Sequence, residues 1–338
     1  MALHRFLVVA FSVATAFIGP CAWAQATPAG NATVDVGAWL TRIHEAASLR
    51  NYQGTQVFMA GGTMSSSRIA HYCDGSHEYE RVDMLDGQMR RVYRHNDIVY
   101  TLWPQKQLAI VEQQEALPPF PALLQSAEGR VADHYELRSQ GVDRIAGYDA
   151  QVFLLRPRDT YRFAQRLWSE KATGLLLRAD VIGPRDEVLE SSSFSEVAIG
   201  VRPQVDTVVQ PMKRLEGYRI VRAAVAPTQL EAEGWKLAQP LAGFRQISCV
   251  KRPLDFVPEN NGGTPVEVLQ TIYSDGLTHV SVFIEPFDPK RHQRAMHTAV
   301  GATHTLMRRQ GDWWVTVVGD VPTSTLKLFA AALERQRK

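Results

Sequence analysis

The sequence is poor in cysteine and has little net charge. Among 338 residues only Cys21, Cys73 and Cys249 are cysteine, too few for the disulfide framework of small secreted domains. The formal net charge is +2, so the total gives no strong attraction to nucleic acid or to a membrane surface. With 45% hydrophobic residues, a chain of this length can bury a core without cross-links or metals.

Long apolar runs are also missing, except at the start. A short polar start precedes an apolar run over residues 6–18, and the A-x-A pattern Ala22-Trp23-Ala24 follows. The run is too short to span a bilayer, so residues 1–24 are expected to be a signal peptide cleaved after Ala24. The mature chain is then soluble and periplasmic. A lipoprotein signal lipidated at Cys21 is the alternative, and Pro20 directly before that cysteine disfavours it.

Familiar catalytic motifs are absent from the sequence. It contains no G-x-S-x-G, no P-loop and no G-x-G-x-x-G. His292 and His297 are five residues apart, which fits neither a H-E-x-x-H helix nor a Cys-His zinc spacing. The sequence therefore predicts no enzyme, no cofactor and no metal site. A hydrolase whose groups converge from distant parts of the chain stays open as an alternative.

Cys73 and Cys249 would remain after signal cleavage. An oxidising compartment is compatible with a disulfide between them. We favour two free buried thiols, because cysteine is among the residues most often found in cores.

The hydrophobic pattern of the first two thirds predicts one large sheet. Asp35 can cap a helix over 35–51 that has one apolar stripe. Between residues 52 and 198 the period changes to two, in about ten short runs separated by turns such as Asp86-Gly87. We predict a strongly curved antiparallel sheet, whose concave face the helix and an apolar piece at 117–127 cover.

The remaining third predicts a smaller α+β domain. Residues 203–225 have three prolines nearby and no sustained period, which indicates a linker. Roughly five strands and a closing helix capped by Thr323 or Ser324 follow. The predicted fold class is α+β, with domains at 33–202 and 226–335.

The segment GDWWVTVVGDVP, residues 311–322, predicts a strand that is apolar on both faces. We assign Trp313, Val315 and Val317 to the core under the closing helix. Trp314 then points to the other face and is a candidate for exposure to a partner. The reverse parity, and a purely structural tryptophan pair, stay open.

Two features indicate binding to lipids. Arg156, Arg158, Arg162 and Arg166 fall within eleven residues, and on one face of neighbouring strands they would clamp phosphates of an anionic lipid. A solvated outer face is the alternative. In addition, a curved sheet with an apolar inner face predicts a cavity for acyl chains.

Five stretches of the sequence can be compared with known proteins: NYQGT (51–55), ERVDMLDGQMRRVYR (80–94), LWSEKATGLLLRADVIGPRDEVLESSSFSEV (167–197), IYSDGLTHVSVFIE (272–285) and WWVTVVGDVP (313–322). They resemble the RseB/MucB family, periplasmic regulators of the envelope-stress sigma factor. They occur in the family's order and extend over essentially the whole mature chain. One departure is Arg91, where the family more often has an acidic residue.

The resemblance implies an open half-barrel like that of the periplasmic lipoprotein carriers, followed by the smaller domain. It also implies that the protein binds the periplasmic region of an RseA- or MucA-like anti-sigma factor and shields it from the site-1 protease. Lipopolysaccharide or mislocalised lipoproteins would relieve that protection. Tyr273, Asp275 and Trp314 are candidate partner contacts. A lipoprotein or lipid carrier is the alternative function, and a homo-oligomer stays open.

Overall fold

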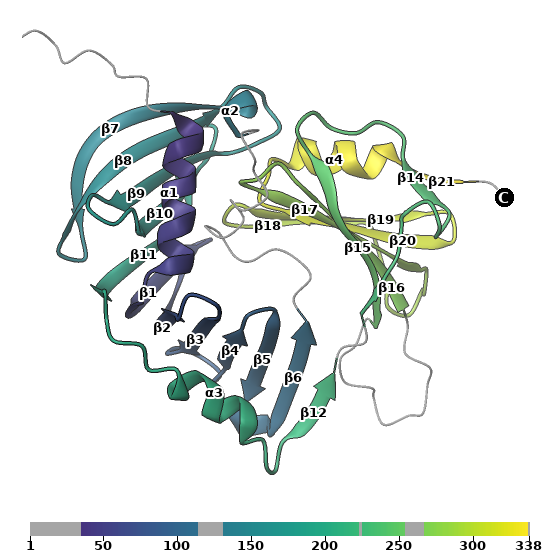
Figure 1. The fold of residues 1–338 in the computed structure, drawn as a ribbon. Coiled ribbons are helices and arrows are strands. Elements are labelled where there is room, and N and C mark those ends of the chain that lie inside the picture. Colours follow the sequence, from purple (N-terminus) through teal and green to yellow (C-terminus); the bar gives the residue numbers. More distant parts are fainter. Residues whose placement is uncertain (1–34, 114–130, 223–224, 254–266, 337–338) are drawn as a thin grey trace, which may run out of the picture. The chain divides into compact units, whose positions relative to one another are not determined.

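The computed structural model describes residues 35–113, 131–222, 225–253 and 267–336. The signal peptide, its cleavage after Ala24, Cys21 and the expected cover at 117–127 lie outside the described residues. Within them, most strands belong to two sheets (Figure 1). The α+β class and the large curved antiparallel sheet are confirmed.

The first sheet has twelve strands in the order β12-β6-β5-β4-β3-β2-β1-β11-β10-β9-β8-β7. Its pairs are antiparallel except β12 with β6, which is parallel. Glycines allow the tight turns: Gly61 and Gly87, for example, have φ of 55° and 69°, a region that side chains with a Cβ disfavour. The strands are β1 (Tyr52–Ala60), β2 (Thr63–Cys73), β3 (Glu78–Met84), β4 (Arg91–His95), β5 (Ile98–Trp103), β6 (Leu108–Gln113), β7 (Tyr135–Ile145), β8 (Tyr148–Pro157), β9 (Ala164–Glu170), β10 (Leu176–Ile182), β11 (Val188–Ile199) and β12 (Arg219–Arg222), with the short helices η1 (Pro104–Lys106) and α2 (Val131–His134) between them.

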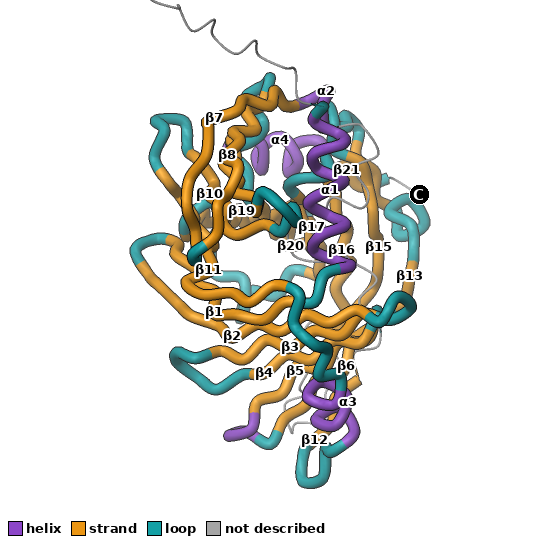
Figure 2. The backbone as a smooth tube through the Cα atoms, turned by 60° about the vertical axis from the view of Figure 1, so that its left-hand side comes forward, coloured by secondary structure: helices purple, strands orange, loops and turns teal. Residues whose placement is uncertain are grey.

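Helix α1 (Val36–Leu49) covers part of this sheet, as predicted. The Asp35 carboxylate accepts hydrogen bonds from the backbone N–H groups of Gly37 and Ala38, at 2.9 and 3.3 Å, which satisfies two donors at the helix start. The apolar stripe of α1 joins Phe153 and Leu155 of β8 in one buried cluster. Figures 1 and 2 show α1 crossing the strands of the first sheet.

The stretch 203–225, expected as a linker, contains helix α3 (Asp206–Lys213) and strand β12. Val208 of α3 is fully buried with Tyr72 and Tyr93, on one face of the first sheet. Strand β12 extends the sheet at β6. Regular structure in this stretch was not predicted; where one domain ends and the next begins stays a prediction.

The second sheet has seven strands in the order β13-β15-β16-β17-β20-β19-β18. Helix α4 (Thr323–Ala332) packs on one face of it through Leu326 and Phe329. The cap predicted at Thr323 or Ser324 is wrong: Pro322 is the N-cap residue and makes no side-chain hydrogen bond. The strands are β13 (Ala226–Pro227), β15 (Arg245–Pro253), β16 (Glu267–Ser274), β17 (His279–Pro286), β18 (Met296–Val300), β19 (Thr303–Gln310) and β20 (Trp313–Gly319), and β14 (Trp235–Leu237) pairs separately with β21 (Leu333–Arg335).

The parity assigned to β20 is confirmed. Val315 and Val317 are fully buried in the same cluster as α4, and the half-buried Trp313 packs against that cluster. Trp314 points to the other face, yet it is only 5% exposed. The His292 ring stacks on it, with ring centroids 4.7 Å apart. The expected exposure of Trp314 is therefore wrong, because the turn after β17 covers this side chain.

Candidate binding pocket and the contacts beside it

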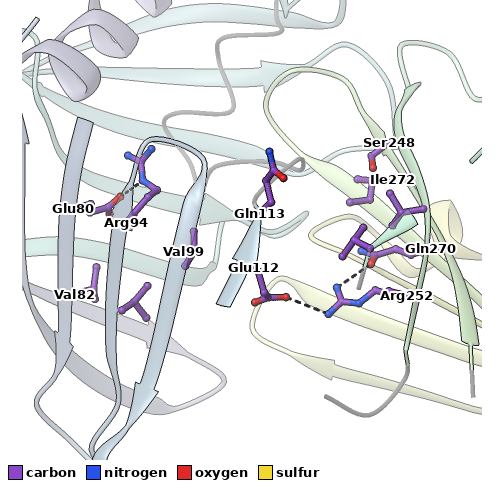
Figure 3. Close-up of a pocket in the computed structure, with 13 residues that line it drawn as sticks. Glu80, Val82, Arg94, Val99, Glu112, Gln113, Ser248, Arg252, Gln270 and Ile272 are labelled. Carbon is purple, nitrogen blue, oxygen red and sulfur yellow. Dashed lines mark hydrogen bonds and ion pairs between the residues drawn. The ribbon is translucent and has the colours of Figure 1, made fainter. Parts of the chain in front are cut away.

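A pocket of about 370 Å³ is lined by strands of both sheets (Figure 3). Alternation along the strands decides which side chains line it. In β3, Glu80 and Val82 point into the pocket, while Tyr79 points to the opposite face and packs in the cluster under α3. The lining residues are Glu80, Val82, Val92, Arg94, Val99, Glu112, Gln113, Val225, Ser248, Val250, Arg252, Gln270 and Ile272.

The charges of the pocket are paired. The Arg94 guanidinium donates to Glu80 at 2.9 Å and to Glu78 at 3.1 Å. Burial works to lower the pKa of Arg94, but the two carboxylates outweigh it and the pKa is raised. Arg252 donates to Gln270 at 3.2 Å and lies 3.5 Å from a Glu112 oxygen. Five valines and an isoleucine form the apolar part of the wall, and Gln113 and Ser248 add uncharged polar groups. The pocket therefore suits an uncharged apolar group flanked by polar atoms.

A buried ion pair connects the two sheets outside the pocket lining. Arg162 lies in the turn between β8 and β9, and Asp275 lies in the turn between β16 and β17. The Arg162 Nε donates to the Asp275 carboxylate, and both side chains are fully buried. The Tyr135 hydroxyl donates to the same carboxylate at 2.9 Å. Burial, with the Asp275 charge second, raises the pKa of Tyr135 well above its usual value.

Glu190 forms a second contact between the sheets. Its carboxylate, on β11, accepts hydrogen bonds from the Ala302 N–H at 3.1 Å and from the Thr303 hydroxyl at 3.3 Å. The Thr303 hydroxyl also lies 2.6 Å from Asp320. Burial, and then the Asp320 charge, raise the pKa of Glu190.

The structure separates the four predicted arginines. Arg156 and Arg158 are exposed, near Glu136, and they help to lower the pKa of that carboxyl, after its hydrogen bond with Arg138. Arg166 is half-buried and lies over the Trp168 ring, 6.0 Å from its centroid. Arg162 is buried in the ion pair with Asp275. The expectation of one exposed row of four guanidinium groups is therefore wrong.

The predicted partner contacts are buried as well. Tyr273 is 4% exposed and packs in the cluster under α4. Asp275 accepts hydrogen bonds from Leu277 N–H and Thr278 N–H, both at 2.8 Å, in addition to Arg162 and Tyr135. None of Tyr273, Asp275 and Trp314 lines the pocket. Their role in partner binding stays a prediction.

Sequence reasoning did not single out the pocket residues. The sequence contains only part of the information that locates the pocket. The alternation of side chains along β3 puts Glu80 and Val82 on one face, but nothing in the sequence shows that this face lies opposite β15. Among the described residues, no three His, Cys, Asp or Glu side chains gather as metal ligands. No helix of the described chain is long and apolar enough to cross a membrane.

The chain is similar to known proteins over nearly its whole length. Residues 35–213 match the MucB/RseB N-terminal domain and residues 229–334 match the MucB/RseB C-terminal domain. The sigma factor AlgU regulatory protein MucB of Pseudomonas aeruginosa is 28% identical, covering 91% of this chain and 93% of that protein. The sigma-E factor regulatory protein RseB of Escherichia coli K12 is 23% identical, covering 95% of each.

Two solved structures are similar in fold and sequence. One is the complex of Pseudomonas aeruginosa MucA and MucB, at TM-score 0.68 and 26% identity, covering 89% of this chain and 99% of that chain. The other is MucB in complex with MucA(peri), at TM-score 0.66 and 25% identity, covering 90% of this chain and 100% of that chain.

Proposed function

The chain belongs to the MucB/RseB family, and on that premise we propose that it is an exported regulatory protein that binds the periplasmic region of an anti-sigma factor. The observation that carries this is the match of both domains to one family, together with the solved complexes of MucB with MucA. Its relatives are named as sigma factor regulators. We propose binding, not catalysis, as its activity.

The pocket offers a place for an extended segment of that partner. Its wall of Val82, Val92, Val99 and Ile272 fits an aliphatic or aromatic side chain. Ser248 and Gln270 supply polar groups beside that wall for the backbone of the segment. A segment held between strands is inaccessible to a protease, which needs an extended chain in its own cleft. Binding would in this way shield the anti-sigma factor from site-1 cleavage.

Asp275 and Tyr273 contribute to this function indirectly in our proposal. Asp275 holds the β16–β17 turn against the first sheet through Arg162 and Tyr135. Tyr273 and Trp314 stabilise the second sheet from inside. The exposed Arg156 and Arg158 stay candidates for an anionic lipid signal. The signal peptide would direct the chain to the periplasm, and cleavage after Ala24 would release the mature protein there.

The test is capture of the partner by residues 25–338 from solubilised envelope, followed by a binding measurement with the captured protein's purified periplasmic region. We expect a single-pass inner-membrane protein, and slower site-1 cleavage of it when the chain is present. Val92→Glu places a charge in the pocket and should weaken binding at least about tenfold. Val142→Glu, on β7 and 64% exposed, is the matched control. If Val92→Glu and Val142→Glu bound the partner equally well, the partner would bind outside the pocket. If no single-pass inner-membrane protein were captured, the proposed function would be refuted.

A further inference from the structure

Exposed apolar side chains gather at two turns of the first sheet. Met59 and Met64 face each other across the β1–β2 hairpin and are 49% and 67% exposed. Leu85 and Met89 lie in the turn between β3 and β4 and are 46% and 41% exposed. Isolated exposed apolar residues are ordinary on protein surfaces, whereas a group of large ones indicates a binding surface. We call these four residues the apolar tip.

Two hydrogen bonds join the two turns into one surface, one between backbone groups and one to a side chain. The Leu85 N–H donates to the carbonyl of Ser66 at 2.9 Å, and the Ser66 N–H donates to the Asp86 carboxylate at 2.5 Å. The Met84 N–H donates to the carbonyl of Arg90 at 3.0 Å and closes the turn. Leu85 is therefore fixed beside the strand that carries Met64, only two residues from Ser66.

Arginines border the apolar tip. Arg68 and Arg90 are exposed, and among the described residues no hydrogen bond or ion pair engages either guanidinium. Arg91, the position that departs from the family pattern, is 43% exposed and 3.8 Å from Asp83. The other Asp83 oxygen lies 2.6 Å from Arg81. Arg68, Arg81, Arg90 and Arg91 therefore outnumber the two nearby acids, Asp83 and Asp86, and the surface around the tip has an excess of positive charge.

This combination determines the chemistry of the occupant. The methionine side chains of the tip are long, unbranched and flexible, and no residue of the tip lines either of the two pockets described in the structure. They suit the boundary between headgroups and acyl chains of a bilayer. Arginines beside them suit phosphate groups, which guanidinium binds through two parallel hydrogen bonds. A surface with both features favours an anionic bilayer over a neutral one.

We propose that the apolar tip and Arg68, Arg90 and Arg91 dock this protein on the surface of an anionic lipid bilayer. Leu85 and Met89 insert among the acyl chains near the headgroups, and the arginines contact lipid phosphates. This docking does not use the pocket, because no residue of the apolar tip lines it. It attaches the protein weakly and reversibly to a membrane surface.

Flotation with lipid vesicles tests the proposal. Residues 25–338 are used, because the apolar run at 6–18 would itself bind lipid. We expect binding to vesicles of phosphatidylglycerol and phosphatidylethanolamine, at least about tenfold weaker binding to pure phosphatidylcholine vesicles, and loss of binding at high salt. Arg90→Gln with Arg91→Gln should weaken binding about tenfold or more, since each arginine near an anionic surface contributes about fivefold.

A second pair of variants tests insertion. Leu85→Gln with Met89→Gln should also weaken vesicle binding, and Met89→Trp should give a blue shift of fluorescence when anionic vesicles are added. The matched controls are Leu328→Gln, 42% exposed on α4, and Arg185→Gln, whose side chain is 88% exposed; both should bind as the unaltered chain does.

Three outcomes would overturn the proposal. The first is equal binding to anionic and neutral vesicles. The second is the same loss of binding in the control variants as in the tip variants. The third is binding of soluble short-chain phosphatidylglycerol, or capture of an acidic protein, through the tip without any binding to vesicles.

Discussion

Arg162 and Asp275 form an ion pair in which neither side chain is exposed to solvent, although 113 residues separate them. The Arg162 guanidinium also donates to the Ala242 carbonyl at 2.7 Å and lies over the Phe244 ring, 4.6 Å from its centroid. Two turns of different sheets are thereby held together. Such a pair contributes to specificity more surely than to stability, because desolvation of both charges offsets much of their attraction.

Arg162→Met should destabilise the protein by about 3–5 kcal/mol, because it leaves the Asp275 carboxylate buried with no cation beside it. Adding Asp275→Asn removes that charge, so the double variant should be less destabilised than the sum of the two single variants. Urea denaturation of all four proteins measures the coupling. Arg138→Ala, which removes an exposed pair with Glu136, is the control and should cost less than about 1 kcal/mol.

If the losses of stability in Arg162→Met and Asp275→Asn added up to the loss in the double variant, the ion pair would not be the connection between the two turns. A change in the slope of the denaturation curve, or a split into two transitions, would indicate that the sheets unfold separately once Arg162 is lost.

Glu190 predicts a pH dependence of stability. Its pKa is raised from an ordinary value of 4.5 by burial and by Asp320. A raised pKa means that the folded state favours the protonated carboxyl. The stability from this group is therefore fully present below pH 4.5 and is lost as the pH rises through the raised pKa. Glu190→Gln mimics the protonated form, so the variant should gain on the unaltered chain as the pH rises.

Denaturation midpoints of the unaltered chain and Glu190→Gln, measured between about pH 4 and pH 7, give this difference. Glu187→Gln is a control for which the stability difference should change with pH in the opposite direction. Backbone hydrogen bonds lower the pKa of Glu187, so its contribution is present at higher pH and is lost as the pH falls. The stability of the unaltered chain is subtracted from that of Glu190→Gln at each pH, because burial lowers the pKa of His304. This histidine changes the pH dependence of both proteins, and the subtraction removes its contribution. If the denaturation midpoints of the unaltered chain and of Glu190→Gln changed with pH in the same way, the raised pKa of Glu190 would be contradicted.

Local sequence signals predicted much of the fold. Asp35 and the stripe of Trp39, Leu40 and Ile43 predicted α1, because cap and period agree within one helix. Helix α3 was missed, since it is short and contains Pro211, although Val205, Val208, Val209 and Met212 show helical spacing. Strand β18 was missed because all five of its residues are exposed and leave no apolar alternation.

The pocket and the buried junctions depend on long-range contacts. Four arginines close in sequence predicted one exposed row, yet Arg162 is buried between its neighbour Asp159 and Asp275, which comes from a distant strand turn. Trp314 looked exposed because α4 can cover only one face of β20; the turn carrying His292 covers the other. Neither the contact with Asp275 nor the cover by His292 can be recognised from the local pattern.

Both tryptophans of β20 are now expected to matter for stability. Trp314→Ala should cost about 3–5 kcal/mol, because the side chain is 5% exposed and its removal leaves a cavity. Trp313 is half-buried, with its ring 5.7 Å from Trp235 and 4.9 Å from the Arg335 guanidinium, so Trp313→Ala should cost less. Urea denaturation measures both losses.

His292→Ala is the matched test of the cover over Trp314. It removes the stacked ring and should shift tryptophan fluorescence to the red without unfolding the chain. A Trp314→Ala protein as stable as the unaltered chain, and weakened only in partner binding, would restore the original expectation of an exposed anchor.

The two remaining cysteines should be free and should differ strongly in reactivity. Cys73 on β2 and Cys249 on β15 are unpaired in the described structure. Burial raises the pKa of the Cys249 thiol to about 11, and only the thiolate reacts with a maleimide. At pH 8 Cys249 should therefore react about a hundredfold more slowly than an ordinary exposed cysteine, while the half-buried Cys73 reacts sooner. After denaturation without reductant, residues 25–338 should take up two labels. Cys249→Ser provides the assignment, because it should remove only the slow phase. Uptake of no label by the denatured chain would mean that the two cysteines form a disulfide, and the two sheets would then be joined covalently.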